Sequence, residues 1–448
     1  MKFPHPLALL TGCIALAATL TWVLPAGQYD RHHDDATGKE IVVPGTYHRV
    51  AASPVSPFQA VVAIPKGMAE AGSVIFLVLL VGGAFVVVDK TGALRQATGW
   101  LAGWLANRSL LVIPVVALFF ATGGAVENMG EEIIALIPVL LLLTRRLGFD
   151  AVVAVAMSLG AAAVGAAFSP VNPFQVGIAQ KLAQLPLLSG WAFRCAVLAV
   201  ALALWIGGTM RYALKNKNGE KGEKGEKGEK GEEALGLRGM AILILVLAAF
   251  VTFVFGILKL GWDFDQMSAL FFIMGVLAGV IGGLGVQGTA LAFAEGFASM
   301  AYAAALIGFA RAIFVVLDQG QIIDTVVHGL FTPIAALPAG LAALAMMGAQ
   351  LGIHFPVPSV SGQAVLTLPV LVPLSDLIGL SRQVTVLAYQ YGAGLGELLT
   401  PTNGALMAVI AAAGVPYDKW LKFATPLALL LIALGGAAVL GAIAVGLS

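Results

Sequence analysis

The sequence predicts an all-α polytopic membrane protein with two inverted-topology repeats, each containing a re-entrant helical hairpin and a broken transmembrane helix. Three observations lead to this prediction. The composition is that of a chain that spans a bilayer several times, a proline motif occurs at equivalent places in two halves, and a charged low-complexity segment separates these halves.

Composition places the chain in the lipid bilayer. Hydrophobic residues make up 59% of its 448 residues, charged residues make up 11%, and the mean hydropathy is +0.94. Soluble domains average about 25% charged residues. Several apolar stretches approach or exceed the roughly 20 residues of a helical span. They lie at 6–24, 73–88, 191–210, 240–258, 267–281 and 426–447.

Composition also argues against nucleic-acid binding and against catalysis as functions of this chain. The net charge of +1 gives no reason to expect a nucleic-acid partner, and the polar segments are too short for a catalytic domain. Cys13 and Cys195 lie singly in apolar runs, without the spacing of a metal or redox site. We therefore expect no enzyme and no cofactor.

The first 57 residues are predicted to form a transmembrane helix and an outer polar loop. The apolar stretch at 6–24 lacks a clear small-residue cleavage site before a polar mature domain, so we interpret it as an uncleaved span. The polar segment that follows, 28–56, would lie on the outer face of a bacterial-type inner membrane.

A linker is expected at 214–237, where the run GEKGEKGEKGEKGEE alternates charge and contains no apolar residue. Such a segment cannot bury a core, so it should be disordered. Arg211, Lys215, Lys217 and Arg238 flank the neighbouring spans. The positive-inside rule therefore places the linker in the cytoplasm.

The two halves share landmarks in the same order. SPVN at 169–172 and TPTN at 400–403 are 231 positions apart (400 − 169), Gly67 and Gly296 are 229 apart (296 − 67), and Gly130 and Gly362 are 232 apart (362 − 130). Constant offsets of this kind indicate an internal repeat. We predict repeats at 58–213 and 288–448, with transmembrane helices at 238–287 leading into the second.

A hairpin is predicted in each repeat. Arg108 and Arg145 flank the apolar stretch 110–143, which is interrupted by the polar residues 122–132, so the chain should enter the membrane and return on the same side. Its arms of about 11 to 13 residues are too short to span alone. The stretch 344–374, which turns at 356–363, is its counterpart in the second repeat.

The proline motifs are predicted to break a helix in each repeat. Pro170 should end one helix near Phe168, with Asn172 as the N-cap of the next, and Pro401 should act in the same way, with Thr402 or Asn403 as the cap. Backbone groups freed inside a membrane cost several kcal/mol each unless water, an ion or a solute meets them. Helix N-termini suit carboxylates, and exposed carbonyls suit Na⁺.

Ionisable residues at these places are candidates for solute or ion binding, because charge inside a membrane is usually functional. Glu131 stands at capping-box spacing from Asn128, so capping is the alternative for it. Arg311 and Asp318 are two helical turns apart on one helix face, which favours a structural ion pair or an interfacial anchor. The alternative for Arg311 is binding of a substrate carboxylate. The residues that this reasoning selects are Asn128, Glu131, Glu132, Asn172, Arg311, Asp318, Ser361, Glu397, Thr402 and Asn403, with His354 as a less favoured coupling group.

The strings GGAVENMGEE, SPVNPFQVGIAQ and TPTNGALMA resemble the YfcC-like branch of the C4-dicarboxylate anaerobic carrier family, in the ion-transporter superfamily. The resemblance covers nearly the whole chain except the linker. It implies the fold of dicarboxylate/sodium symporters, in which hairpin tips and broken-helix loops bind substrate and Na⁺, and it suggests a homodimer. By position it implies binding residues at the first tip (Asn128, Gly130, Glu131), the first break (Ser169, Asn172), the second tip (Ser361, Gly362, Gln363) and the second break (Thr400, Thr402, Asn403), with Na⁺ near Asn128, Asn172, Ser361 and Asn403.

The sequence as a whole predicts a secondary active transporter of a small carboxylate-bearing solute, working by coupling to Na⁺ or H⁺ or by exchange. The glutamates of the first tip and Glu397 favour an amino acid, including a basic one, because unpaired carboxylates repel a dianion. A C4-dicarboxylate is the alternative, and Arg311 would support it. A channel is disfavoured because it needs a continuous pore lined by equivalent groups.

Overall fold

The computed structural model describes residues 5–34, 39–93, 96, 109–216, 236–260, 262 and 264–447. The predicted disordered linker at 214–237 falls almost entirely on 217–235, outside the described residues.

The described chain is almost entirely helical. The first half contains α1 (Pro6–Val23), β1 (Gly27–Gln28), β2 (Arg31–Asp34), β3 (Lys39–Val42), β4 (His48–Arg49), α2 (Pro57–Glu70), α3 (Gly72–Lys90), η1 (Ser109–Leu111), α5 (Val112–Glu127), α6 (Glu132–Arg146), α7 (Ala151–Val155), η2 (Ala156–Gly160), α8 (Ala161–Ala167), η3 (Pro173–Gly177), α9 (Ile178–Leu182) and α10 (Trp191–Asn216). The second half contains α11 (Leu237–Leu260), α12 (Phe264–Ile281), α13 (Gly285–Gln319), α14 (Ile323–Phe331), η4 (Thr332–Ala336), α15 (Ala339–Ile353), α16 (Val360–Leu377), α17 (Arg382–Gly396), α18 (Gly404–Ala412) and α19 (Tyr417–Ala444).

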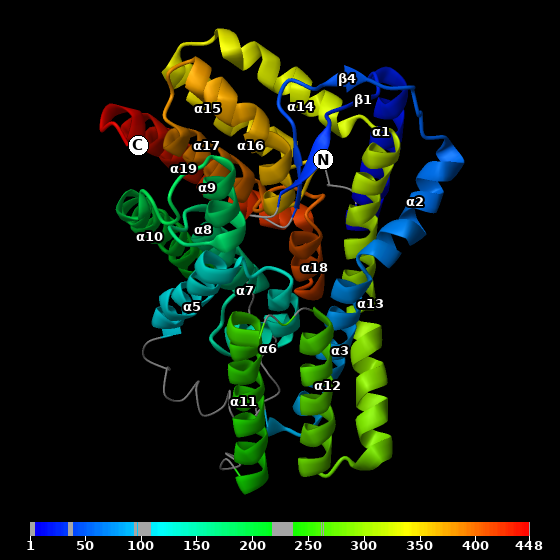
Figure 1. The fold of residues 1–448 in the computed structure, drawn as a ribbon. Coiled ribbons are helices and arrows are strands. Elements are labelled where there is room, and N and C mark those ends of the chain that lie inside the picture. Colours follow the sequence, from blue (N-terminus) through cyan, green and yellow to red (C-terminus); the bar gives the residue numbers. More distant parts are fainter. Residues whose placement is uncertain are drawn as a thin grey trace.

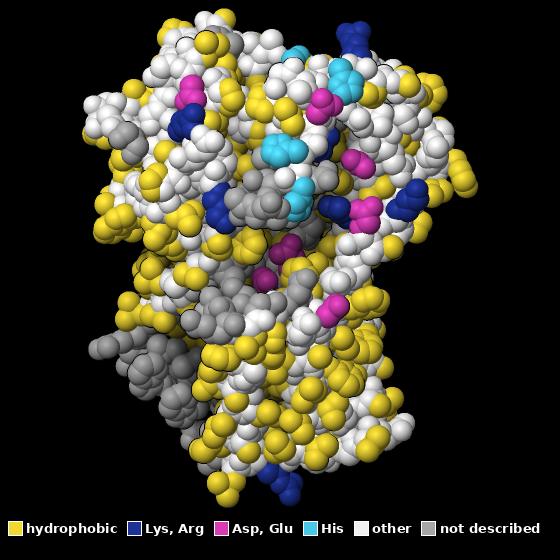
Figure 2. Space-filling model, viewed as in Figure 1, with side chains coloured by type: hydrophobic (Ala, Val, Ile, Leu, Met, Phe, Trp, Pro, Cys, Tyr) yellow, Lys and Arg dark blue, Asp and Glu magenta, His cyan; other side chains and the backbone are white. Residues whose placement is uncertain are grey.

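The helices are long and apolar enough to cross a membrane repeatedly. Seven such helices occur among the described residues, and hydrophobic side chains predominate on the lower part of the face shown in Figure 2. They are Gly72–Lys90, Ser109–Val126, Trp191–Asn216, Phe264–Ile281, Gly285–Gln319, Val360–Leu377 and Tyr417–Ala444. The predicted multi-pass membrane protein is therefore confirmed.

The long helix α13 extends along one side of the molecule (Figure 1). It packs against α1, α2, α3 and α18, while α12 packs against α3, so helices of the two halves are interleaved. At one end lie α14 and two short antiparallel ribbons, β1 with β4 and β2 with β3, and α11 and α12 extend to the opposite end.

Each half contains a pair of helices joined by a polar turn. In the first half these helices are α5 and α6, of 16 and 15 residues, and in the second they are α15 and α16, of 15 and 18 residues. The predicted arms of about 11 to 13 residues were too short. The helices extend further because Gly123 and Gly124, which we had assigned to the polar interruption, continue α5 up to Glu127.

Both predicted helix breaks are confirmed. The helix formed by α7, η2 and α8 ends at Ala167, and the side chain of Asn172 caps η3, which begins at Pro173. In the second half α17 ends at Gly396, and Asn403 caps α18. Of the two caps considered for the second break, the structure has Asn403.

Small residues bring the helices together around these breaks. A Cβ at Gly124 would lie 2.0 Å from the carbonyl oxygen of Ala162, and one at Gly165 would lie 2.1 Å from that of Ala121, so α5 and α8 are in backbone contact. Close approach through small residues is the usual way in which membrane helices associate. Gly396, which is 231 positions after Gly165 (396 − 165), packs against the side chain of His354 at the end of α15.

Asp150 connects the halves at the start of α7. Its carboxylate accepts hydrogen bonds from the Tyr212 hydroxyl at 2.8 Å and the Val152 N–H at 3.2 Å, and it pairs with Lys419 of α19 at 2.9 Å. Burial alone would raise the pKa of Asp150, but these bonds outweigh it and lower the pKa below its ordinary value. Although a charge at the start of a helix is usually solvated, the side chain of Asp150 is buried and paired.

Candidate functional site

A cavity of about 660 Å³, here called the central cavity, lies where the two helix pairs and the second break meet. Ten predicted residues line it, and they come from both halves of the chain. They are Asn128, Gly130, Glu131, Glu132, Arg311, Ser361, Gly362, Glu397, Thr402 and Asn403.

Five other predicted residues do not line this cavity. Ser169, Asn172, Gln363 and Thr400 are buried in the protein around it, with 0%, 0%, 0% and 8% exposure, and Asp318 lines a second, smaller cavity. The two breaks are therefore unequal, because only the second exposes polar side chains of its own motif to the central cavity.

The first tip is held in an unusual backbone conformation. Asn128 ends α5 with φ of 58°, in the left-handed region that Asn tolerates better than most residues. Gln175 of η3 donates to its side-chain oxygen at 2.7 Å, and the carboxylate of Glu132 accepts from the Gly130 N–H at 2.9 Å. The predicted capping box between Asn128 and Glu131 is wrong, because Asn128 terminates the preceding helix and α6 has no side-chain cap.

The first break supports this tip from behind. The Ser169 hydroxyl donates to the carbonyl of Ala125 at 2.6 Å, and the Asn172 side-chain N–H donates to that of Gly124 at 2.8 Å. The Asn172 oxygen accepts from the N–H groups of Phe174 and Gln175, both at 2.9 Å. The polar atoms of Ser169 and Asn172 are thus used within the protein, where they fix the last turn of α5.

The second tip has a matching connection. Ser359, rather than Ser361, caps α16 by accepting from the Gly362 N–H, and Ser361 lines the cavity from the first turn. The Thr402 hydroxyl of the second break donates to the carbonyl of Phe355 at 2.7 Å. Phe355 is 231 positions after Gly124 (355 − 124), so both breaks bind the same carbonyl of their own helix pair.

A buried polar network joins α15 to α16 behind the second tip. The Gln363 amide donates to the backbone carbonyl of Gln350 at 2.6 Å, and the Gln350 amide donates to the Thr367 hydroxyl at 2.7 Å. His354 contacts the Gln363 oxygen through Nδ1 at 3.3 Å, and its Nε2 has no hydrogen-bond partner within the described residues. Gln363 therefore holds the two helices together and does not face the solute space.

Negative charge predominates in the central cavity. The carboxylates of Glu70, Glu131, Glu132 and Glu397 and one guanidinium, that of Arg311, line it. Arg311 Nε donates to Glu70 at 2.8 Å, so the predicted pair of Arg311 with Asp318 is wrong. Figure 2 shows acidic side chains inside a hollow in the middle of this face. No basic side chain pairs with Glu131 or Glu397 within the described part of the chain.

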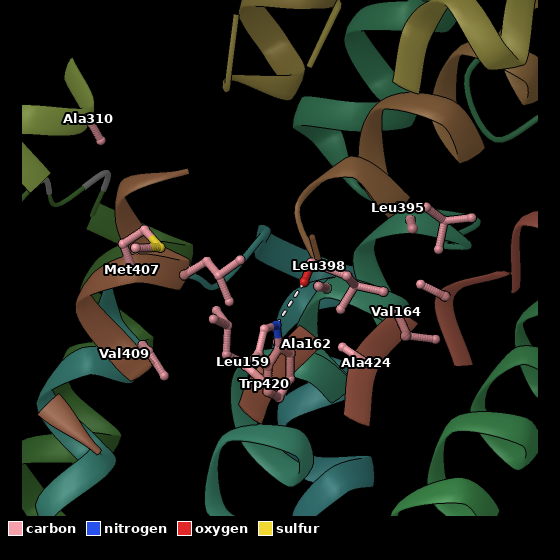
Figure 3. Close-up of a cluster of buried hydrophobic side chains, with 14 of the residues drawn as sticks. Leu159, Ala162, Val164, Ala310, Leu395, Leu398, Met407, Val409, Trp420 and Ala424 are labelled. Atoms are coloured by element: carbon pink, nitrogen blue, oxygen red, sulfur yellow. Dashed lines mark hydrogen bonds between the residues drawn. The ribbon is translucent and has the colours of Figure 1, made fainter. Parts of the chain in front are cut away.

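Apolar packing fixes the wall next to Glu397. The Trp420 indole donates to the carbonyl of Leu398 at 2.9 Å, and Leu159 and Ala162 lie beside it (Figure 3). Leu398 and Trp420 also line the central cavity. This bond satisfies a carbonyl that the end of α17 leaves free, and it anchors the second break to α19.

Sequence reasoning missed two charged residues, Glu70 and Arg194. Glu70 lies in a short polar interval between two apolar runs, a place where charge could have been noticed, and it neutralises Arg311. Arg194 is fully buried and donates to Gln383, Gln390 and the Ser189 carbonyl, at 2.8, 3.1 and 2.7 Å. An arginine inside an apolar run was the available signal. Gln390 donates in turn to the Ser169 carbonyl at 2.8 Å, which connects Arg194 to the first break.

Within the described ranges, no group of three or more His, Cys, Asp or Glu side chains is arranged so that it could bind a metal ion. Oxygens suited to a hard monovalent cation are present at the first tip. The Gln175 side-chain oxygen is buried and has no hydrogen-bond partner among the described residues, and the same side chain donates to Asn128. The predicted Na⁺ site beside Asn128 stays a prediction.

Comparison with known proteins identifies the family. The family model described as "C4-dicarboxylate anaerobic carrier" matches residues 3–444. The chain belongs to the C4-dicarboxylate anaerobic carrier family. The chain is 30% identical to the Escherichia coli (strain K12) protein named "Putative basic amino acid antiporter YfcC", over 98% of this chain and 96% of that protein. It is 27% identical to an uncharacterized protein of Haemophilus influenzae, over 97% and 96% of the two chains.

Two solved structures cover nearly the same length. The YdaH transporter of Alcanivorax borkumensis covers 99% of each chain with a TM-score of 0.45 at 17% identity. MtrF of Neisseria gonorrhoeae covers 98% of this chain and 94% of its own, with a TM-score of 0.39 at 15% identity. Membership in this carrier family, with seven helices able to span a membrane, points to a multi-pass membrane carrier rather than an enzyme.

Proposed function

We propose that this carrier is a secondary active transporter of a basic amino acid, working by exchange or by coupling to Na⁺ or H⁺. The observation that carries the proposal is the charge of the central cavity. Among its described lining residues there are four carboxylates and one guanidinium, which is paired with Glu70, and the carboxylates of Glu131 and Glu397 have no basic partner among the described contacts. A solute with an extra positive charge would complete this arrangement.

The lining of the cavity offers complementary groups for both ends of a basic amino acid. The N-termini of α16 and α18 both line it, at Val360 to Gly362 and at Asn403 to Leu406, and helix N-termini favour carboxylates. The carboxylates of Glu131 and Glu397 both line this cavity. We propose that the α-carboxylate binds the helix N-termini and that the side-chain cation binds between these two glutamates.

We further propose that the halves are inverted repeats and that the helix pairs are re-entrant hairpins. The repeated connection between break and hairpin, at Gly124 and Phe355, supports equivalence of the halves. The hairpins and broken helices would then move against the remaining helices to expose the cavity alternately to each side. The protein would lie in a bacterial-type inner membrane as a homodimer, with the linker 214–237 in the cytoplasm.

The coupling ion in this scheme is Na⁺ at the first tip, near Asn128 and Asn172, with the equivalent place near Ser361 and Asn403. The unpartnered oxygen of Gln175 supports it, since carbonyl and amide oxygens are ligands of hard cations. H⁺ is the alternative, with Glu131 and Glu397 as the groups that would carry it.

A C4-dicarboxylate is the second candidate solute. The description of the family favours it, whereas the name of the relative YfcC favours a basic amino acid. Within the cavity the dicarboxylate would depend on Arg311, which would have to leave Glu70. A channel is disfavoured because the described cavity has two unequal sides and no ring of equivalent groups.

A thermal-shift measurement on the purified protein distinguishes these solutes. We expect arginine, lysine or ornithine to raise the melting temperature, and succinate and malate to leave it unchanged, with and without Na⁺ at two pH values. A ligand at about a hundred times its Kd stabilises by about 2.7 kcal/mol.

Glu397→Gln should abolish the shift by basic amino acids, because it removes one of the two carboxylates. Glu295→Gln is the matched control, since this exposed glutamate pairs with Lys90 and lines neither cavity. Stabilisation by succinate or malate but by no amino acid would overturn the proposed solute. An unchanged shift in Glu397→Gln would overturn the role of that residue.

A further inference from the structure

A second cavity of about 310 Å³, here called the side cavity, adjoins the central one. Phe314, Val357 and Gly362 line both cavities. The rest of its wall comes from the C-terminal end of α13, the start of α14, one side of α16, and residues 27–34 and 39–49, here called the strand segment. The side cavity and the central cavity thus share part of their walls.

The strand segment places its own cation on an acidic group of this side cavity. Arg31 Nη2 donates to both carboxylate oxygens of Asp324, at 2.7 and 2.9 Å, and the Tyr29 N–H donates to one of them at 2.9 Å. Asp324 is only 3% exposed, whereas 35% of the Arg31 side chain is exposed. A buried carboxylate therefore depends for its charge balance on a side chain that reaches it from the surface.

Other contacts hold the strand segment without Arg31. The Tyr47 ring stacks on His328 with 4.0 Å between ring centroids, and its hydroxyl lies 3.0 Å from that of Thr325. The Gly27 N–H donates to the Gln321 carbonyl at 3.0 Å. None of these contacts of the strand segment involves Arg31.

The side cavity also has more negative than positive charge. Asp318 lines it together with Asp324, and Arg31 is the one Lys or Arg side chain among its described lining residues. The carboxylate of Asp318 has neither a hydrogen bond nor an ion pair among the contacts of the described residues. An incoming cation would therefore meet one carboxylate that is available and a second that an internal guanidinium occupies.

We propose that the side cavity is an entrance subsite for a guanidinium or ammonium group, and that Arg31 occupies it as an internal substitute for the solute. The cationic end of the solute replaces Arg31 at Asp324, passes Phe314 and Gly362, and reaches the glutamates of the central cavity. Arg31 then returns to Asp324 and closes the entrance behind it. The chemical class of this ligand rests on the proposed function, whereas the exchange of cations at Asp324 rests on the contacts above.

Thiol labelling tests the subsite without measuring transport. Val365 lines the side cavity, so Val365→Cys, in a chain with Cys13 and Cys195 replaced by Ala, reports access to it through its reaction with a cationic methanethiosulfonate reagent. We expect Arg31→Gln to speed labelling by at least about fivefold. Arg31→Lys should resemble the parent, and so should the matched control Arg49→Gln, which removes an exposed arginine of the same segment.

Guanidinium ion at low millimolar concentration identifies the ligand chemistry. It should slow labelling in Arg31→Gln, where Asp324 is free to bind it, and have no effect in the double variant Arg31→Gln/Asp324→Asn. Size-exclusion profiles equal to that of the parent establish that each variant is folded. Equal labelling rates in the parent and in Arg31→Gln would overturn the proposal, and so would an absence of protection by guanidinium.

The result of the labelling experiment does not depend on the result of the thermal-shift measurement that tests the proposed function. Protection by guanidinium, combined with a thermal shift by dicarboxylates alone, would keep the subsite and refute the amino acid as solute. A thermal shift by arginine without protection at Val365→Cys would keep the proposed function and refute the subsite.

Discussion

The side chain of Asn172 binds two segments that meet beside the central cavity. It caps η3 through its oxygen and fixes the last turn of α5 through its N–H group, and it has no exposed surface. Ser169 repeats this connection one carbonyl further along α5. At the scale of single residues, the first break therefore positions Asn128 and Glu131, and these residues face the solute space.

Asn172→Ala should lower both stability and uptake. The change leaves the Gly124 carbonyl and two backbone N–H groups without their partner, which costs about 2 to 4 kcal/mol. We expect a lower melting temperature of the purified protein and loss of uptake in proteoliposomes. Asn216→Ala at the end of α10 is the control, with an effect within about 0.5 kcal/mol.

The two readouts separate positioning from direct binding. If Asn172→Ala loses uptake while its melting temperature and that of the parent agree, the side chain acts on the solute itself. That result would refute the positioning role assigned here.

At the scale of elements, the packing of the helices around the central cavity depends on small residues as much as on the polar motifs. The helices α5 and α8 are in contact through Gly124 and Gly165, and α15 and α17 through Gly396. These contacts set the distance between each hairpin and the broken helix behind it. The hydrogen bonds from the breaks to Gly124 and Phe355 need this separation, since a side chain of three or four heavy atoms has to reach a carbonyl on the neighbouring helix.

Gly124→Ala should disrupt the first hairpin. The added methyl group would lie 2.0 Å from the Ala162 carbonyl oxygen, so α5 would have to shift away from α8. We expect a lower yield of monodisperse protein and a melting temperature well below that of the parent. Gly207→Ala in α10 is the control, because nothing lies within 4 Å of the position that its Cβ would take. Equal melting temperatures for Gly124→Ala and the parent would contradict this account of the packing.

The sequence predicted the elements better than the contacts between them. Proline and Asn mark both breaks through local backbone chemistry, so their positions follow from the motifs alone. The end of α5 was misplaced because glycines that pack against another helix look the same in sequence as glycines of a turn. The capping assigned to Asn128 failed for a related reason, since an Asn can equally end a helix in the left-handed conformation.

At the scale of the molecule, tertiary contacts decide features that no local pattern carries. Glu70 and Arg311 lie 241 positions apart, and Arg31 and Asp324 lie 293 apart, yet each pair is in contact. The hydrophobic stretches and the repeat offsets predict where the helices, hairpins and breaks of each half lie. They do not predict how α13 packs against α2 and α3, or where the strand segment lies, and these two arrangements create the cavity walls.

The interleaving of the halves leads to a prediction about the segment that joins them. The interface between halves includes α3 with α12 and α13, α10 with α19, and the strand segment with α14 and α16. The segment 217–235 contains almost no apolar residue, so its contribution to assembly is an increased local concentration of one half for the other. Fragments 1–216 and 236–448, expressed together, should therefore copurify and respond to basic amino acids in the thermal-shift assay.

Either fragment alone should aggregate, because the faces of α3 and α13 that pack on each other would be exposed. Copurification would be measured through an affinity tag on one fragment, with size-exclusion chromatography to establish a defined complex. Failure of the fragments to associate, under conditions in which the uncut chain is stable, would mean that the covalent connection is needed for assembly. The contacts between α3, α12 and α13 would then be too weak to fix the central cavity on their own.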